Sequence, residues 1–223
     1  MNHLILFDFD GTLADTAPDL VATANRQRAY HGLPPLPDPA LRPHASQGAR
    51  GLLKAALGLE PQADTYEAAR RRFLDDYAQI MLEQACLFAG IAELLDELEQ
   101  HHLAWGIVTN KSEALARPIA RHLGIEARSL VTVGGDTTPH IKPHPEPLLH
   151  AARQARIEPT RCIYIGDDER DVQAGKAAGM ATVAAAYGYG TQNDPTRWQA
   201  DAIAQTPDEL WPIIRQWATK GAA

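Results

Sequence analysis

Short runs of apolar residues recur along the chain, and each of them ends in small or polar residues. Their composition and length are typical of strands that are buried on both faces of a parallel sheet. We therefore expect strands at residues 4–9, 103–110, 129–135, 162–168 and 181–187. Helical patterns lie between or after them, at residues 91–101, 112–123, 145–155, 169–178 and 207–219. The alternation of strand and helix predicts an α/β fold with a doubly wound parallel sheet.

The stretch from residue 16 to residue 87 breaks this alternation. It contains helix-forming segments at 17–31, 48–57 and 64–84 and no convincing strand. The turn-rich sequence HGLPPLPDP (31–39) separates its first helix from the others. We therefore predict an inserted α-helical cap domain, residues 16–87, in a core domain made of residues 1–15 and 88–223.

Composition and charge exclude several classes of protein. Of the 223 residues 45% are hydrophobic and 22% are charged, which is ordinary for a folded chain and argues against a disordered or fibrous one. The formal net charge is −7 and no basic run occurs, so neither nucleic acid nor an acidic membrane surface is expected as a partner. No apolar run approaches the ~20 residues of a membrane span. The N-terminus has no basic region and its apolar run is broken by Asp8 and Asp10, so no signal peptide is expected. Cys86 and Cys162 are far apart and lack metal-site spacing, so a reducing, cytoplasmic location is expected. The protein is expected to be a monomer or a homodimer.

Two carboxylates stand at the end of the first predicted strand. Asp8 and Asp10 are two positions apart, so their side chains point to the same side, and Gly11 lets the chain turn. Ligands of open α/β sheets bind beyond the carboxyl ends of the strands, which is where this pair lies. One carboxylate can act as a nucleophile there while the other transfers a proton.

The surrounding string, DFDGTLADT (8–16), resembles the nucleophile motif of the haloacid dehalogenase superfamily, DxDGTLxDT. Three further signatures of that superfamily follow in the expected order at later strand ends. They are Thr109-Asn110, Lys142 in HIKPHPEP, and GDDERD (166–171). Each alone has a simpler interpretation as a helix cap, a solvated lysine or a capping acid, but together they indicate an active site.

The resemblance implies a phosphoryl-transfer mechanism centred on two aspartates. Asp8 would be the nucleophile that forms an aspartyl-phosphate, and Asp10 would protonate the leaving alcohol and then activate water. Mg²⁺ would be held by Asp8, Asp167 and the backbone carbonyl of Asp10. A divalent cation is needed because a phosphoryl dianion and an anionic nucleophile repel each other, and Mg²⁺ prefers oxygen ligands.

The resemblance also assigns roles around the phosphoryl group. Thr109 and the backbone near Asn110 would donate hydrogen bonds to its oxygens, and Lys142 would offset its charge. The fourth motif commonly reads GDxxxD, so Asp171 would organise Lys142 or metal-bound water rather than bind the metal. Asp168 is counted with Asp171 as a supporting residue.

The whole chain resembles the small-cap subfamily of this superfamily, in which a helical insertion lies between the first and second motifs. Within that subfamily the sequence is most similar to phosphoglycolate phosphatases, in TAPDL, IVTNK, KPHPEPLL and GDDERDVQAGKAAGM. The cap segment ASQGARGLL (45–53) is a candidate specificity loop, in which Ser46 would meet an anion and Arg50 would bind a carboxylate. A plain helix start with a solvated arginine explains the same segment equally well.

The resemblance therefore implies an Mg²⁺-dependent phosphatase of a small phosphorylated metabolite, with 2-phosphoglycolate as the first candidate. N-acetylmuramic acid 6-phosphate and other sugar phosphates are alternatives. A phosphomutase would use the same aspartyl-phosphate and return the phosphoryl group to the substrate. A catalytically silent binding module is the third class, although the intact set of motif residues argues against it.

Overall fold

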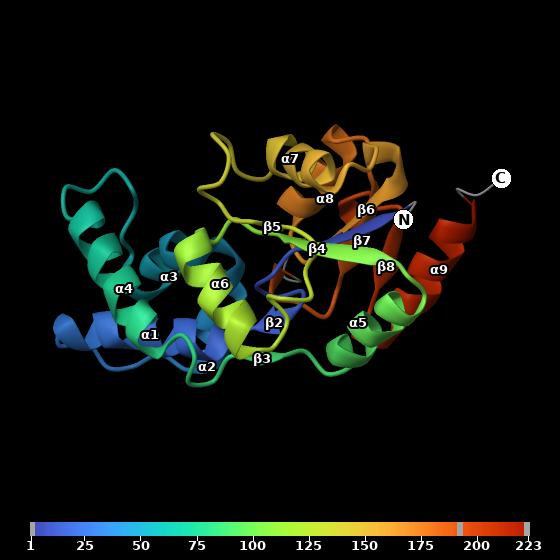
Figure 1. Ribbon diagram of the computed structural model, residues 1–223. Coiled ribbons are helices and arrows are strands. Elements are labelled where there is room, and N and C mark those ends of the chain that lie inside the picture. Colours follow the sequence, from blue (N-terminus) through green and yellow to red (C-terminus); the bar gives the residue numbers. More distant parts are fainter. Residues whose placement is uncertain (1–2, 191–193, 221–223) are drawn as a thin grey trace.

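A six-stranded parallel sheet forms the centre of the computed structural model, which describes residues 3–190 and 194–220 (Figure 1). The strands are β1 (Leu4–Phe7), β4 (Ala104–Val108), β5 (Thr132–Val133), β6 (Cys162–Gly166), β7 (Ala181–Ala185) and β8 (Ala202–Ala204). Their order across the sheet is β5-β4-β1-β6-β7-β8, and all the pairings are parallel. The predicted α/β fold is confirmed, and β1 lies between β4 and β6.

One predicted strand is shorter than expected, and one observed strand was not predicted. The strand expected at 129–135 is reduced to the two residues of β5, because the chain turns away at Gly134 and Gly135. A Cβ atom at Gly135 would lie 2.2 Å from the carbonyl oxygen of Asn110, so only glycine permits this close approach. β8 was not predicted, because a strand of three residues between polar neighbours leaves almost no pattern.

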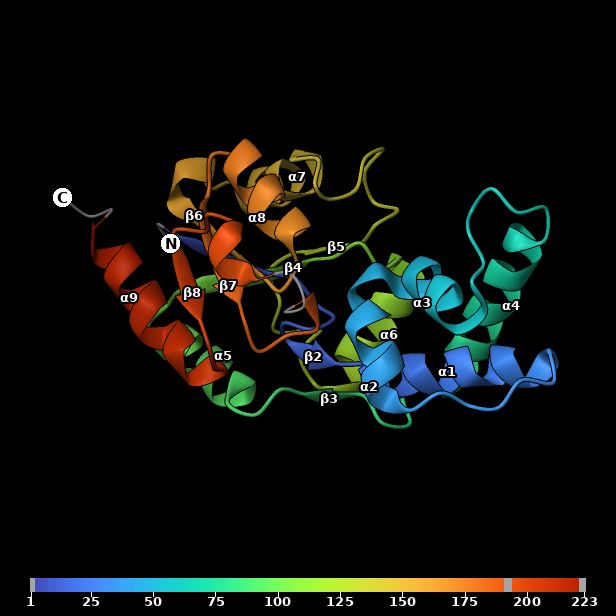
Figure 2. The same ribbon diagram turned by 180° about the vertical axis from the view of Figure 1, so that it is seen from behind.

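Helices cover both faces of the sheet, as its alternating side chains require. Leu4 and Leu6 of β1 pack with α7 (Glu146–Ala155) and α8 (Glu169–Ala177) on one face. Ile5 and Phe7 pack on the other face with α5 (Ile91–Gln100), α6 (Glu113–His122) and α9 (Leu210–Lys220). Figure 2 shows the two helical layers on opposite sides of the strands. Short 3₁₀-helices are η2 (Pro159–Arg161), η4 (Pro195–Arg197) and η5 (Pro207–Glu209).

A helical unit is inserted between β1 and β4. It comprises α1 (Ala17–Tyr30), α2 (Asp38–Leu41), the 3₁₀-helix η1 (Arg42–Gln47), α3 (Gly48–Leu57) and α4 (Tyr66–Ile80). Leu20, Leu52 and Phe73 form part of its buried interior, which is continuous with one face of the sheet. We call it the cap, and the division into residues 16–87 and the remaining core stays our proposal.

Three details of the cap differ from expectation. The chain enters and leaves it through an antiparallel ribbon of β2 (Ala14–Asp15) and β3 (Cys86–Leu87), whose strands are too short to give a periodic signal. α2 begins at Asp38 inside the expected turn, because Pro39 suits the first turn of a helix. α4 ends at Ile80 rather than at residue 84.

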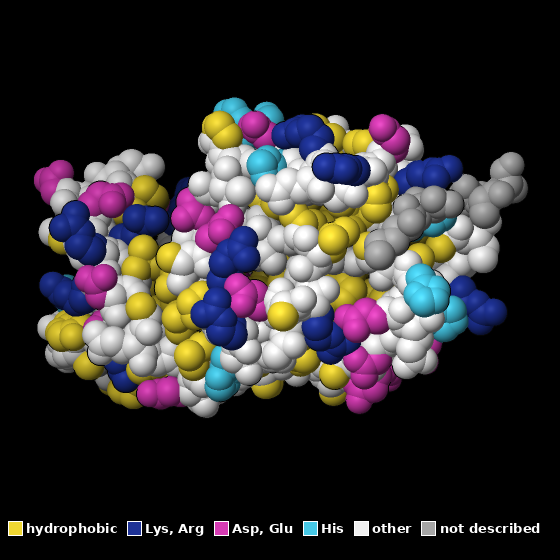
Figure 3. Space-filling model, viewed as in Figure 1, with side chains coloured by type: hydrophobic (Ala, Val, Ile, Leu, Met, Phe, Trp, Pro, Cys, Tyr) yellow, Lys and Arg dark blue, Asp and Glu magenta, His cyan; other side chains and the backbone are white. Residues whose placement is uncertain are grey.

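The surface carries mixed charges. On the face shown in Figure 3, Lys and Arg side chains are interspersed with Asp and Glu, so that face has no continuous basic area. Among the helices of the described residues, none combines the length and the apolar character that crossing a membrane requires.

Candidate active site

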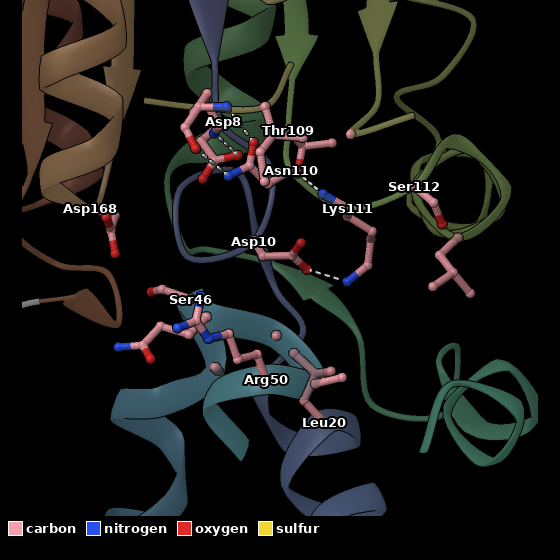
Figure 4. Close-up of a pocket in the computed structure, with 18 of the residues that line it drawn as sticks. Asp8, Asp10, Leu20, Ser46, Arg50, Thr109, Asn110, Lys111, Ser112 and Asp168 are labelled. Carbon is pink, nitrogen blue, oxygen red and sulfur yellow. Dashed lines mark hydrogen bonds and ion pairs between the residues drawn. The ribbon is translucent and has the colours of Figure 1, made fainter. Parts of the chain in front are cut away.

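The predicted site residues lie where three neighbouring strands end. Asp8 follows β1, Thr109 follows β4 and Asp167 follows β6, and these strands are adjacent in the sheet. The chain turns sharply after Asp10 because Gly11 has a φ of +84°, and a Cβ atom there would lie 2.3 Å from Oδ2 of Asp167. A cavity of about 480 Å³ opens above the strand ends, and residues of the core and the cap both line it. In Figure 4, Asp8, Thr109 and Asn110 lie on the core side of this cavity and Ser46 and Arg50 on the cap side.

Lys142 lies between two carboxylates at the core end. Its Nζ atom is 2.7 Å from Oδ1 of Asp8 and 2.7 Å from Oδ1 of Asp171, and its side chain is 3% exposed. It also donates to the hydroxyl of Tyr164 at 2.7 Å. The side chain of Asn110 fixes the backbone of Lys142 by accepting from its N–H at 2.9 Å and donating to its carbonyl at 3.1 Å. The amide of Asn110 thus positions the backbone of Lys142.

Three carboxylates form a compact acidic cluster. Oxygen atoms of Asp8, Asp167 and Asp171 lie within 4.8 Å of one another, and one lysine is too little charge to balance them. Buried carboxylates at this spacing suit a hard divalent cation such as Mg²⁺. Both oxygens of Asp171 are already engaged, Oδ1 by Lys142 and Oδ2 by the N–H of Asp168 at 3.1 Å. Asp171 therefore orients Lys142, and Asp8, Asp167 and Asp171 together are the carboxylates that could hold a cation.

Asp167 is held by a loop to which the sequence assigned no role. Its Oδ2 accepts from the backbone N–H groups of Tyr189 at 2.8 Å and Gly190 at 3.2 Å. The hydroxyl of Thr12 donates to Oδ1 at 3.3 Å. A Cβ atom at Gly188 would lie 2.2 Å from Cβ of Asp167, so the sequence YGYG (187–190) allows this close contact. Backbone donors leave no residue-type signal, but the two glycines after the last predicted strand were a clue to a close approach.

Burial dominates the electrostatics of the cluster in the absence of a cation. It raises the pKa of Asp8 to about 7, although Lys142 opposes the shift. It also raises the pKa of Asp167 well above the ordinary value, and the neighbouring Asp8 and Asp171 add to the effect. Burial acts to lower the pKa of Lys142, but Asp171 and Asp8 outweigh it, so the pKa is raised and the ammonium stays charged.

Mg²⁺ is therefore expected to stabilise the protein more at pH 8 than at pH 5. A carboxyl group with a raised pKa binds protons more tightly in the folded state, so it weakens folding as the pH rises through that window. For Asp8 the window extends from 3.8 to about 7 in the metal-free protein. A bound cation favours the ionised carboxylates and removes this penalty. At pH 8, with Mg²⁺ about 100-fold above its Kd, Tm should rise by about 5–10 °C in a thermal melt.

The same melts in EDTA give the metal-free reference. The Asp8→Asn variant is the control, because it lacks the titrating carboxyl group and should respond less to Mg²⁺. An equal Tm shift at both pH values in the unsubstituted protein would contradict the expectation.

Asp10 is oriented by two residues that motif analysis did not single out. Its Oδ1 accepts a hydrogen bond from the hydroxyl of Thr16. The same oxygen forms an ion pair with Nζ of Lys111 at 2.7 Å. Figure 4 shows its side chain directed toward Lys111. Thr16 and Lys111 both belong to the quoted strings DFDGTLADT and IVTNK, so a signal for them was present. Thr109 accepts from the N–H of Lys111 at 3.1 Å, which leaves its own hydroxyl proton for a ligand.

The cap residues differ in what they contact. Ser46 donates to Oδ2 of Asp167 at 3.1 Å, so its hydroxyl meets the acidic cluster. Arg170, another residue missed in the sequence, donates to the carbonyl of Ser46 at 2.8 Å and pairs with Asp168 at 2.7 Å. Asp168 is also the N-cap of α8. Arg50 lines the cavity as an exposed side chain, with no ion pair to any residue of the described ranges 3–190 and 194–220.

Comparisons with known proteins agree with this geometry. A family model described as haloacid dehalogenase-like hydrolase matches residues 5–185. A phosphoglycolate phosphatase of Xanthomonas campestris is 46% identical over 93% of this chain and 94% of its own length. An N-acetylmuramic acid 6-phosphate phosphatase of Pseudomonas aeruginosa is 44% identical over 94% and 93%. The crystal structure of a predicted phosphoglycolate phosphatase from Haemophilus somnus superposes with a TM-score of 0.85 at 27% identity, covering 96% of this chain and 98% of that one.

Proposed function

Because the chain belongs to the haloacid dehalogenase-like hydrolases and is a phosphatase of that family, we propose that it hydrolyses a small phosphorylated acid, with 2-phosphoglycolate as the preferred substrate. The observation that carries the proposal is the convergence of Asp8, Asp167 and Lys142 at the ends of adjacent strands, with Asp10 two residues beyond the nucleophile. The similar proteins are named for phosphoglycolate and for N-acetylmuramic acid 6-phosphate, and both names support a phosphorylated acid as the substrate class.

The mechanism follows from the residues around Asp8. Its carboxylate attacks phosphorus, the bond to the substrate alcohol breaks, and an aspartyl-phosphate forms. Lys142, 2.7 Å from Asp8, offsets the charge that accumulates on the phosphoryl oxygens. Thr109 donates its hydroxyl proton to one of those oxygens, as do backbone N–H groups near Asn110. Bound Mg²⁺, held by Asp8, Asp167 and the carbonyl of Asp10, would supply further charge neutralisation.

Asp10 transfers the protons. It gives one to the leaving alcohol in the first step and takes one from water in the second, when water attacks the aspartyl-phosphate and releases phosphate. Thr16 and Lys111 hold its side chain for this purpose. Ser46 and Arg50 belong to the cap side of the site. Ser46 donates a hydrogen bond to Asp167, and Arg50 contacts the part of the substrate that lies away from the phosphate.

A second substrate has a specific argument. N-acetylmuramic acid 6-phosphate is named for a similar protein at 44% identity, and it too carries a carboxylate besides its phosphate. A cavity of about 480 Å³ lies within the range that accepts drug-sized ligands, so size does not reject it. Arg50 at the cap end suits an acidic group that lies far from the phosphate.

Phosphate release from a substrate panel tests the proposal. The purified protein with Mg²⁺ should act on 2-phosphoglycolate with a kcat/KM at least about tenfold above that for N-acetylmuramic acid 6-phosphate and hexose phosphates, a difference of ~1.4 kcal/mol. The reverse preference would favour the second substrate. Isomerisation of a sugar phosphate without free phosphate would replace the hydrolase by a phosphomutase, and no reaction with any compound would overturn the proposal.

A further inference from the structure

Lys111 is a nearly buried cation in the wall of the active-site cavity, two residues after Thr109. Its ammonium lies 2.7 Å from Oδ1 of Asp10 and 3.1 Å from the hydroxyl of Tyr77, a residue of α4 in the cap. The side chain is 8% exposed, and Nζ lies 4.8 Å from the centre of the Tyr77 ring. The ammonium of Lys111 therefore lies where the core and the cap meet, in the wall of the cavity.

The ammonium of Lys111 has donor capacity left. Lysine carries three N–H donors, and residues within 3–190 and 194–220 accept two of them. Burial acts to lower the pKa of Lys111, but Asp10 outweighs it, so the pKa is raised and the group stays charged. A buried charged donor without an acceptor is costly, so an acceptor in the cavity would be stabilising.

The other cations near the cavity are differently placed. Lys142 already contacts Asp8 and Asp171, and Arg170 is paired with Asp168. Arg50 and Arg70 of the cap are exposed, and Arg70 lies 3.9 Å from Glu67 of its own helix. In the view of Figure 4, Lys111 and Asp10 lie between Asp8 and Arg50, so Lys111 lies nearer than Arg50 to the phosphoryl end.

We propose that Lys111 binds the carboxylate of the substrate and thereby selects short phosphorylated acids. This inference rests on the proposed function and deepens it. In 2-phosphoglycolate a single methylene carbon separates the carboxylate from the ester oxygen, so a phosphoryl group held at Asp8 leaves the carboxylate close beside it. In N-acetylmuramic acid 6-phosphate the carboxylate belongs to the lactyl group, on the far side of the sugar ring. The carboxylate of the short acid would therefore lie near Lys111, and the carboxylate of the long acid would lie near Arg50.

A pair of matched substrates isolates the carboxylate. 2-Phosphoglycolate and 2-hydroxyethyl phosphate differ only in a carboxylate against a hydroxymethyl group. The wild-type enzyme is expected to prefer the acid, and Lys111→Met should lower the ratio of the two kcat/KM values by roughly 10- to 100-fold, the size of one charged hydrogen bond. Tyr77→Phe is the control variant, since it removes one acceptor of Lys111 but keeps the charge and the ring, and it should leave the ratio within about twofold.

Because Lys111 also contacts Asp10, a loss of rate alone does not distinguish binding from positioning. The same two ligands are therefore titrated calorimetrically into Asp8→Asn and into Asp8→Asn/Lys111→Met, neither of which turns them over. Weaker binding of 2-phosphoglycolate alone supports the inference. Equal losses for both ligands, or a wild-type enzyme without preference for the acid, would overturn it while phosphate release still upholds the phosphatase. Absence of phosphate release from either substrate would overturn the proposed function itself.

Discussion

Replacement of Asp8 by asparagine is expected to abolish phosphate release while the protein remains folded. Asparagine keeps the size of the side chain but cannot form the aspartyl-phosphate, so kcat should fall by roughly 10⁴- to 10⁶-fold, as when other covalent nucleophiles are removed. Folding should not suffer, because burial raises the pKa of Asp8 to about 7 and the neutral amide avoids that cost. Steady-state phosphate release and a thermal melt at pH 8 in EDTA measure the two effects.

Asp64→Asn is the matched control. It makes the same chemical change at an exposed position of the cap, outside the residues that line the cavity, and should leave kcat unchanged. Turnover by Asp8→Asn at more than about a hundredth of the wild-type rate would show that another group is the nucleophile.

Replacement of Lys142 by methionine is expected to damage both stability and activity. Lys142 lies 2.7 Å from two carboxylates and is 3% exposed, so its loss leaves Asp8 and Asp171 buried with no balancing charge. Breaking a buried pair in this way costs about 3–5 kcal/mol, which urea denaturation in Mg²⁺-free buffer would measure. The loss of charge at the phosphoryl group should lower kcat by about 10²- to 10³-fold in the presence of Mg²⁺.

Two further variants show whether the effect belongs to the carboxylates. Lys54→Met breaks an exposed ion pair of 2.8 Å with Glu60 and should cost less than about 1 kcal/mol. In Asp8→Asn/Lys142→Met one of the two stranded carboxylates is gone, so part of the stability should return, and the double-mutant cycle gives the coupling. Equal stability of Lys142→Met and Lys54→Met would contradict the role of Lys142 as a buried counter-ion.

The elements that could be predicted from the sequence are those whose apolar runs are long enough to form a pattern. β1, β4, β6 and β7 of the sheet fall within predicted strands, and α3 has the predicted bounds. The ribbon strands β2 and β3 and the edge strand β8 have two or three residues each, and their pairing depends on distant partners. Local sequence carries little information about such contacts.

The candidate site also has a part that could be predicted from the sequence and a part that could not. Asp8, Asp10, Lys142 and Asp167 belong to recognisable strings. The structure places the first three in the wall of one cavity and Asp167 beside Asp8. The contacts that orient them are of another kind. The ion pair of Lys111 with Asp10 joins segments about a hundred residues apart, and Asp167 is held by backbone N–H groups of a distant loop. The strings IVTNK and YGYG contain these residues, but only the tertiary structure shows which side chains they contact.

The central position of β1 has a consequence for the order of events during synthesis. Leu4 of β1 pairs with Ala104 of β4 and with Cys162 of β6, and both partners come much later in the chain. The cap is one continuous segment and is complete before either partner leaves the ribosome. The most apolar strand of the core therefore stays without neighbours while the cap acquires its own interior, and β1 joins the sheet by long-range, slow pairing. Nascent chains stalled so that the part outside the ribosome ends between β3 and β4 are thus expected to carry a protease-resistant cap and an exposed first strand.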